Sequence, residues 1–252
     1  MVTRLTHGPP IVLIDYRASR AGAVADELLR GFSGYLQTYA YGGYNGTAAR
    51  VDVTPVGCWA HARRKFDVAA KSASGPGARA QAQKALGFIR QLYAIERLIK
   101  GQSPEEKKAY RDQHSRPVLG QFRQWIDETL ILAEVREGVL KTAYTYVINQ
   151  WPKLLVYLED GRLHIDNNHA ERFNRPIAQD RKQWLFAQSE VGVHATAAWY
   201  SVIATAKANG WEPYHYLKEL FTQLPQYLQD GKPLDDLMPW LMPKPAEVGG
   251  WG

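Results

Sequence analysis

Residues 166–176 read Asp-Asn-Asn-His-Ala-Glu-Arg-Phe-Asn-Arg-Pro, and residues 181–186 read Arg-Lys-Gln-Trp-Leu-Phe. Asn168 precedes Glu171 by three residues, a spacing typical of a helix start. In such a start the amide oxygen accepts from free backbone N–H groups, and the glutamate reaches back to the cap. Capping is therefore one interpretation of this stretch.

The basic residues that follow Glu171 favour a second interpretation. These residues are Arg172, Arg175, Arg181 and Lys182. A carboxylate can ligate a divalent metal ion, and clustered cations suit the phosphate backbone of a nucleic acid. The residues alone leave both interpretations open.

Several stretches together resemble the insertion-sequence-66 family of bacterial transposases. The first is the motif Asp-Asn-Asn-x-Ala-Glu-Arg with Pro176 and Arg-Lys-x-Trp-Leu-Phe behind it. The other stretches occur in the same order as in the family. They are Pro9-Pro10 with Tyr16 and Arg20, residues 34–45, residues 58–66, and residues 205–210 with Pro213 and Tyr216-Leu217. The resemblance covers nearly the whole chain.

The resemblance implies a ribonuclease-H-like fold in which an Asp-Asp-Glu triad holds two divalent metals, Mg²⁺ or Mn²⁺. Such metals activate water or a 3′-hydroxyl to attack a DNA phosphodiester. Glu171 matches the third triad position, whereas Tyr39 occupies the position of the second aspartate. The first aspartate is expected upstream of the first residue. A neutral phenol is a poor magnesium ligand, so metal binding is doubtful. The resemblance gives no triad role to Asp15, Asp52 or Asp166.

Two functions follow from the resemblance. The first is DNA transposition by an Asp-Asp-Glu transposase that is catalytically impaired in this chain. The alternative is a non-catalytic remnant that binds DNA or associates with a transposase. The implied partners are DNA, other transposase subunits and a separately encoded amino-terminal segment.

Composition agrees with a nucleic-acid partner. Thirty-one basic against 25 acidic residues give a net charge of +6, which favours a polyanion. A single cysteine excludes an internal disulfide framework, and no apolar run approaches the roughly 20 residues of a membrane span. No secretory signal is recognisable, so we expect a cytoplasmic, nucleoid-associated protein.

Hydrophobic patterning predicts an α/β fold that carries a large all-helical insertion. The resemblance implies that the α/β part is a partial ribonuclease-H-like core, strands 3 to 5 with flanking helices. The expected core comprises residues 1–74 and 160–224, and the insertion comprises residues 75–159. Residues 225–252 are expected to form a C-terminal extension with a disordered tail. Strands are predicted at 11–14, 35–38 and 51–56, with a helix at 19–30. The strand order of this fold would leave the first of these strands without its neighbours. Each backbone group without a hydrogen-bond partner would then cost about 1–3 kcal/mol of stability.

A helix is predicted from Trp59 to Lys71, with an apolar face that includes Trp59, Ala62 and Phe66. Its other side carries candidate DNA-binding residues, which are Arg63, Arg64 and Lys65. A merely solvated face is the alternative for each of them. Cys58 and His61 supply too few ligands for structural zinc.

The insertion is expected to contain helices at 78–100, 104–114, 117–136 and 139–158. Ser103, Pro104 and Glu106 predict a capped helix start. Pro117 is expected to separate two helices and Pro152 to kink the last. Beyond the insertion we predict helices at 191–208 and 213–224. The expected buried stripe of the first of these is Val191, Ala195, Ala198, Trp199, Val202, Ile203 and Ala206.

Overall fold

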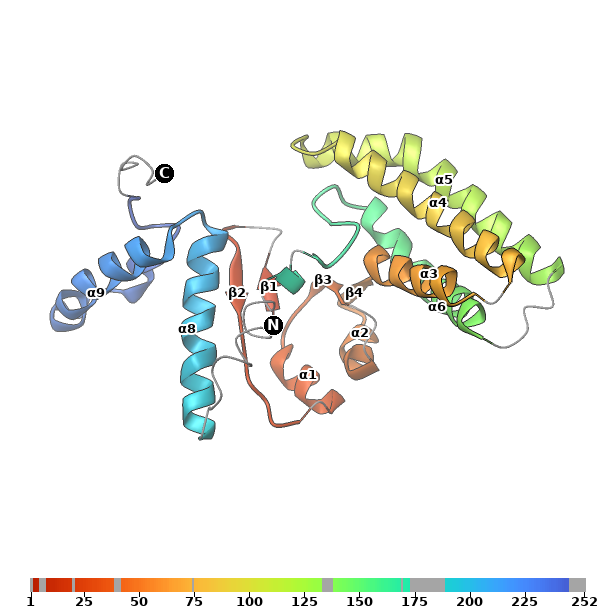
Figure 1. The fold of residues 1–252 in the computed structure, drawn as a ribbon. Coiled ribbons are helices and arrows are strands. Elements are labelled where there is room, and N and C mark those ends of the chain that lie inside the picture. Colours follow the sequence, from red (N-terminus) through yellow and green to blue (C-terminus); the bar gives the residue numbers. More distant parts are fainter. Residues whose placement is uncertain are drawn as a thin grey trace. The chain divides into compact units, whose positions relative to one another are not determined.

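The computed structural model describes residues 2–4, 8–19, 21–38, 42–73, 75–132, 138–168, 170–172 and 189–244. The chain forms two compact units, one of residues 1–18 and 169–252 and the other of residues 19–168 (Figure 1). Each unit has its own apolar core. The predicted helical segment 75–159 lies within the second unit. Among the described residues, no helix combines the length and apolar character that a membrane span requires.

The 19–168 unit begins with a small parallel sheet. Its elements are α1 (Gly22–Leu28), β3 (Gly34–Gln37), η1 (Gly42–Tyr44), α2 (Asn45–Ala48) and β4 (Val53–Val56). β3 and β4 pair in parallel, with Gly34 opposite Val53 and Gln37 opposite Val56. The strands predicted at 35–38 and 51–56 are therefore confirmed.

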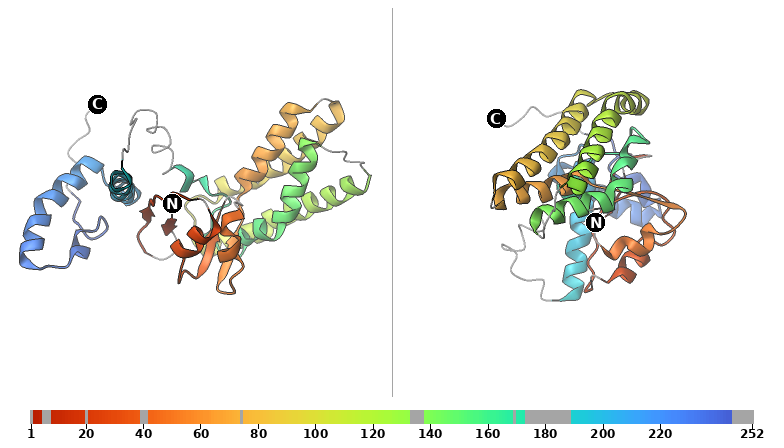
Figure 2. Two further views of the ribbon diagram at one scale, coloured as in Figure 1. Left: turned by 90° about the horizontal axis from the view of Figure 1, so that it is seen from below. Right: turned by 90° about the vertical axis from the view of Figure 1, so that its right-hand side faces the viewer.

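Four helices follow the sheet and lie side by side (Figure 1, Figure 2). They are α3 (Trp59–Ser72), α4 (Pro76–Leu98), α5 (Pro104–Leu132) and α6 (Val139–Leu155), and α6 continues into the 3₁₀ turn η2 (Val156–Leu158). Trp59 is fully buried among the rings of Phe122 and Trp151, and its indole N–H donates to Leu154 O at 3.0 Å. The predicted apolar face of α3 is thus confirmed as part of the core.

The predicted break at Pro117 is wrong, because α5 runs through that residue without interruption. A proline inside a helix costs about 3 kcal/mol. Leu119, Phe122 and Ile126, which follow it, are all buried against the other helices. Burying each such side chain yields about 1.5–3 kcal/mol, so tertiary packing outweighs the local cost.

The predicted start of α5 is confirmed. Glu106 N donates to Ser103 Oγ at 3.2 Å, and Ser103 N donates to Glu106 Oε2 at 2.8 Å. These reciprocal bonds form a capping box, and they lower the pKa of the Glu106 carboxyl.

The other unit contains β1 (Val2–Arg4), β2 (Ile11–Leu13), α8 (Glu190–Ala208), α9 (Pro213–Asp230) and η3 (Leu234–Leu237). β2 pairs antiparallel with β1, and α8 packs against β2. Within the described residues β2 therefore does not join the parallel sheet of β3 and β4. The tail beyond residue 244, predicted to be disordered, lies outside the described residues.

The buried stripe predicted for α8 is wrong in part. Val191 is 79% exposed and Trp199 is 46% exposed, whereas Ser201, Ala204 and Thr205 are buried. Ala206 is fully buried as predicted. The buried side of α8 therefore carries hydroxyl groups that the apolar pattern could not reveal.

Candidate functional site

The motif of residues 166–172, which we call the signature, begins at the carboxyl end of the parallel strands β3 and β4. Gln37, the last residue of β3, donates from Nε2 to His164 O at 2.8 Å and to Gly57 O at 3.3 Å. One side chain thus ties the end of each strand to the segment that leads into residue 166. In open α/β sheets this edge is where ligands bind.

Two further bonds fix this segment to the start of α3. Trp59 N donates to Ile165 O at 3.1 Å, and Asn167 N donates to Cys58 Sγ at 3.3 Å. Burial raises the pKa of the Cys58 thiol, so it serves here as a neutral acceptor. The approach to the signature is therefore held by contacts across more than a hundred residues of sequence.

Asp166 is surrounded by hydrogen-bond donors. The Tyr93 hydroxyl donates to Asp166 Oδ2 at 2.6 Å, and Asn168 Nδ2 donates to the same oxygen at 2.8 Å. Asn168 N donates to Oδ1 at 3.0 Å. The carboxylate thus orders the first turn of the signature, where the sequence predicted a helix start.

The Tyr93 hydroxyl is held in its neutral, donating form. Burial, followed by the hydrogen bond and the negative charge of Asp166, raises the pKa of Tyr93 well above its ordinary range, and Arg63 partly opposes this rise. The structure thus brings Tyr93 of α4 to Asp166, although the two residues lie 73 positions apart in the sequence.

The basic residues of α3 are exposed, as the alternative of a solvated face also allows. Arg63, Arg64 and Lys65 are exposed, whereas the neighbouring Ala62 and Phe66 are buried. Within the described part of the chain, none of the three forms an ion pair. Their charges are therefore available to a polyanion.

Two other predicted site residues are described. Glu171 lies in a helical turn and is partly buried, and Arg172 beside it is exposed. Both belong to the unit that contains α8. Tyr39, Arg175, Arg181 and Lys182 lie outside the described residues.

No group of three or more His, Cys, Asp or Glu side chains suited to a metal ion occurs among the residues that the structure describes. Asp166 already accepts three hydrogen bonds from uncharged donors. A metal pair needs several carboxylate ligands, and the phenol of Tyr39 is a poor substitute for one.

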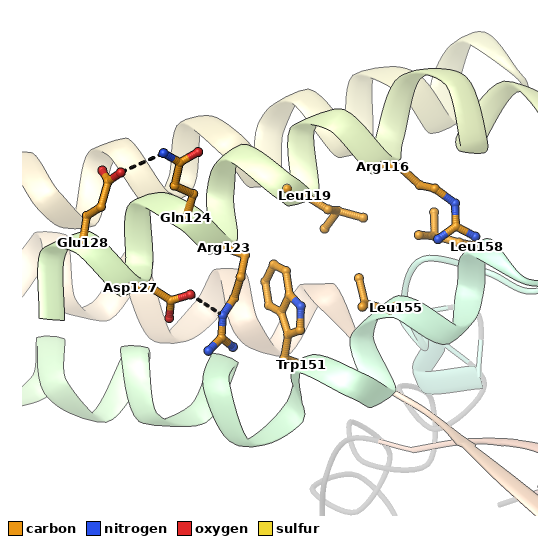
Figure 3. Close-up of a pocket in the computed structure, with 10 residues that line it drawn as sticks. Arg116, Leu119, Arg123, Gln124, Asp127, Glu128, Trp151, Leu155 and Leu158 are labelled. Atoms are coloured by element: carbon orange, nitrogen blue, oxygen red, sulfur yellow. Dashed lines mark hydrogen bonds and ion pairs between the residues drawn. The ribbon is translucent and has the colours of Figure 1, made fainter. Parts of the chain in front are cut away.

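The 19–168 unit has an open groove of about 610 Å³ between α5 and the α6–η2 segment (Figure 3). Its apolar floor includes Leu119 and Trp151. Arg123 on its rim donates to Asp127 at 2.9 Å. The rim cations are thus matched by carboxylates, and this groove offers no net attraction to phosphate.

Comparison with known proteins adds an independent line of evidence. Residues 1–195 match the family model described as "Transposase IS66 family", and residues 201–240 match "IS66 C-terminal element". No solved structure matches the chain.

Two relatives come from Sinorhizobium fredii (strain NBRC 101917 / NGR234), and both are described as uncharacterized proteins. The protein y4hP is 29% identical over 92% of this chain and 44% of its own length. The protein y4qI is 31% identical over 96% of this chain and 45% of its own length. The chain therefore spans less than half the length of these relatives.

Proposed function

The chain belongs to the Transposase IS66 family, and on this premise we propose that it acts in DNA transposition by binding the phosphate backbone of DNA. The observation that carries the proposal is the exposed basic face of α3, with Arg63, Arg64 and Lys65 unpaired by described carboxylates. Cations that neutralise phosphates release condensed counterions, which is the main source of affinity in such complexes.

The proposal extends to the catalytic state. We propose descent from the Asp-Asp-Glu class with a ribonuclease-H-like core, in which this chain does not assemble the Mg²⁺ or Mn²⁺ pair on its own. Tyr39 at the second aspartate position supports this view, as does the engagement of Asp166 by neutral donors. Other transposase subunits would then contribute carboxylates to such a site.

We expect the affinity of the full chain for a short DNA duplex to fall steeply with salt. The slope of log affinity against log salt should be about −0.9 for each phosphate contacted. Replacing Arg63, Arg64 and Lys65 together with glutamine should make this slope shallower by up to about 0.9 per lost contact. Fluorescence anisotropy between about 50 and 200 mM salt measures both slopes.

A matched variant controls for total charge. Arg90, Arg97 and Lys100 are also exposed and belong to α4 and its C-terminal end. Glutamine at these three positions removes the same charge and should leave the slope close to that of the parent. An equal effect of both triple variants would refute the assignment to α3, and a flat slope in the parent would refute DNA binding.

The second candidate function is metal-dependent strand cleavage by this chain alone, which the partly buried carboxylate of Glu171 favours. We expect no cleavage or strand transfer on supercoiled DNA with either Mg²⁺ or Mn²⁺, because the second triad position holds Tyr39. Gel analysis of nicked and linear products measures this. Cleavage that Glu171→Gln abolishes would establish the second function in place of the proposal.

A further inference from the structure

A second open groove, of about 400 Å³, lies on the 19–168 unit between α3 and α6. Both helices are rigidly anchored, since their opposite faces form the core around Phe66 and Tyr144. The groove is lined by Lys65, Lys141, Thr142, Thr145, Tyr146, Asn149 and Gln150. Its walls therefore belong to helices that are packed into the core.

The charge of this groove has one sign. It holds two cations, Lys65 and Lys141, and no carboxylate is among the residues that line it. Neither lysine forms an ion pair within the described residues. The groove near Trp151 differs, since its arginines are paired with aspartates. The α3–α6 groove therefore attracts anions, whereas the other does not.

The α6 wall presents polar side chains at regular helical intervals. Lys141, Thr145 and Asn149 form one row at a spacing of four residues, and Thr142, Tyr146 and Gln150 form the next. Each four-residue step rises about 6 Å, so a row rises about 12 Å. That rise equals between three and four base steps of a DNA strand. Every one of these side chains can donate a hydrogen bond.

Tyr146 of α6 lines the groove close to Lys65 of α3. Lys65 Nζ lies 5.9 Å from the centroid of its ring. Burial raises the pKa of Tyr146 to about 12, so its hydroxyl stays neutral and keeps its proton. A neutral donor adds no repulsion to an approaching phosphate.

We propose that the α3–α6 groove binds the phosphodiester backbone of duplex DNA, with Lys65 and Lys141 as its cations and Thr145 and Asn149 as its neutral donors. This inference rests on the proposed function and adds α6 to the interface. The α6 residues belong to none of the sequence motifs quoted above.

The test compares two double variants of the full chain in the same salt titration. Lys65→Gln with Lys141→Gln should make the log–log slope shallower by about 0.9 for each lysine removed. Lys100→Gln with Lys107→Gln removes the same charge near the α4–α5 turn and should leave the slope unchanged. Equal slopes for the two double variants would overturn the groove assignment while the parent's steep slope still upheld DNA binding. A flat slope in the parent would overturn both.

A change of charge at a single exposed position provides a second readout. Asn149→Glu should weaken DNA binding, and Asn149→Lys should strengthen it, because the groove faces phosphate. A structural effect of substitution would change both variants in the same direction. Shifts of the same sign, or no shift in either variant, would overturn the proposal.

Discussion

Replacing Arg111 with methionine should lower the free energy of unfolding of the 19–168 unit by about 3–5 kcal/mol, the usual cost of removing one partner from a buried ion pair. Arg111 is only 2% exposed. Its Nε and Nη2 donate to the two carboxylate oxygens of Glu96 at 2.8 and 2.7 Å. Methionine would leave this partly buried carboxylate without its cation.

The remaining N–H groups of Arg111 hold the segment that leads into the signature. Nη1 donates to Tyr157 O at 2.8 Å and to Asp160 O at 3.1 Å, and Nη2 donates to Leu163 O at 3.0 Å. All five donors of the guanidinium are therefore used. The variant should lose stability and also loosen the approach to Asp166.

Chemical denaturation followed by tryptophan fluorescence measures the change. Arg116→Met is the matched control, because Arg116 lies on the same helix and pairs with Asp112 at 2.6 Å while half exposed. Exposed pairs contribute about 0–1 kcal/mol, so the control should change stability little. Arg111→Lys keeps the charge but offers three donors instead of five, and an intermediate loss is expected. Equal, small losses for Arg111→Met and Arg116→Met would contradict this account.

Local sequence signals predicted the features that depend on neighbouring residues. The capping box of Ser103 and Glu106 and the buried face of α3 were both readable, because their partners lie three or four residues apart. The exposed trio Arg63, Arg64 and Lys65 follows from the same helical periodicity. These predictions needed no knowledge of the tertiary fold.

The contacts that position the signature could not be predicted in this way. Tyr93 and Asp166 are 73 residues apart, and Arg111 and Leu163 are 52 apart. Propensity and periodicity carry no information about such pairs. Gln37 was visible within the stretch that resembles the family, but only the structure shows it joining β3 to His164.

The edge of β2 shows how the structure meets a cost that the sequence implied. The sequence implied a strand with missing neighbours and orphaned backbone groups. β1 pairs with one edge of β2, and hydroxyl groups of α8 form hydrogen bonds with the backbone at the other edge. A helix can complete a strand edge when it carries hydroxyl groups four residues apart. Ser201 and Thr205 accordingly lie on the buried side of α8, whereas Val191 and Trp199 are exposed.

The hydroxyl groups of Ser201 and Thr205 on α8 should therefore contribute more to stability than hydroxyl groups on an exposed helix surface. Thr205 Oγ1 accepts from Val12 N and donates to Val12 O, each at 3.1 Å, and Val12 is fully buried. Ser201 Oγ accepts from Ile14 N at 2.8 Å. Asn209 Nδ2 continues the row by donating to Pro10 O at 2.9 Å.

Thr205→Val keeps the shape of the side chain but leaves two buried backbone groups of Val12 unsatisfied, at about 1–3 kcal/mol for each group or about 2–6 kcal/mol in all. Adding Ser201→Ala should bring the total loss to about 3–9 kcal/mol, because Ile14 N–H then lacks its acceptor as well. Thr196→Val is the matched control, since Thr196 is exposed and bonds only within the helix, to Gly192 O at 2.8 Å. It should change stability by no more than about 0.5 kcal/mol. Thermal unfolding measures the totals, and amide hydrogen exchange at Val12 and Ile14 locates the effect. If Thr205→Val left exchange at Val12 as slow as Thr196→Val does, another group would have to satisfy this strand edge, and α8 would not be what completes it.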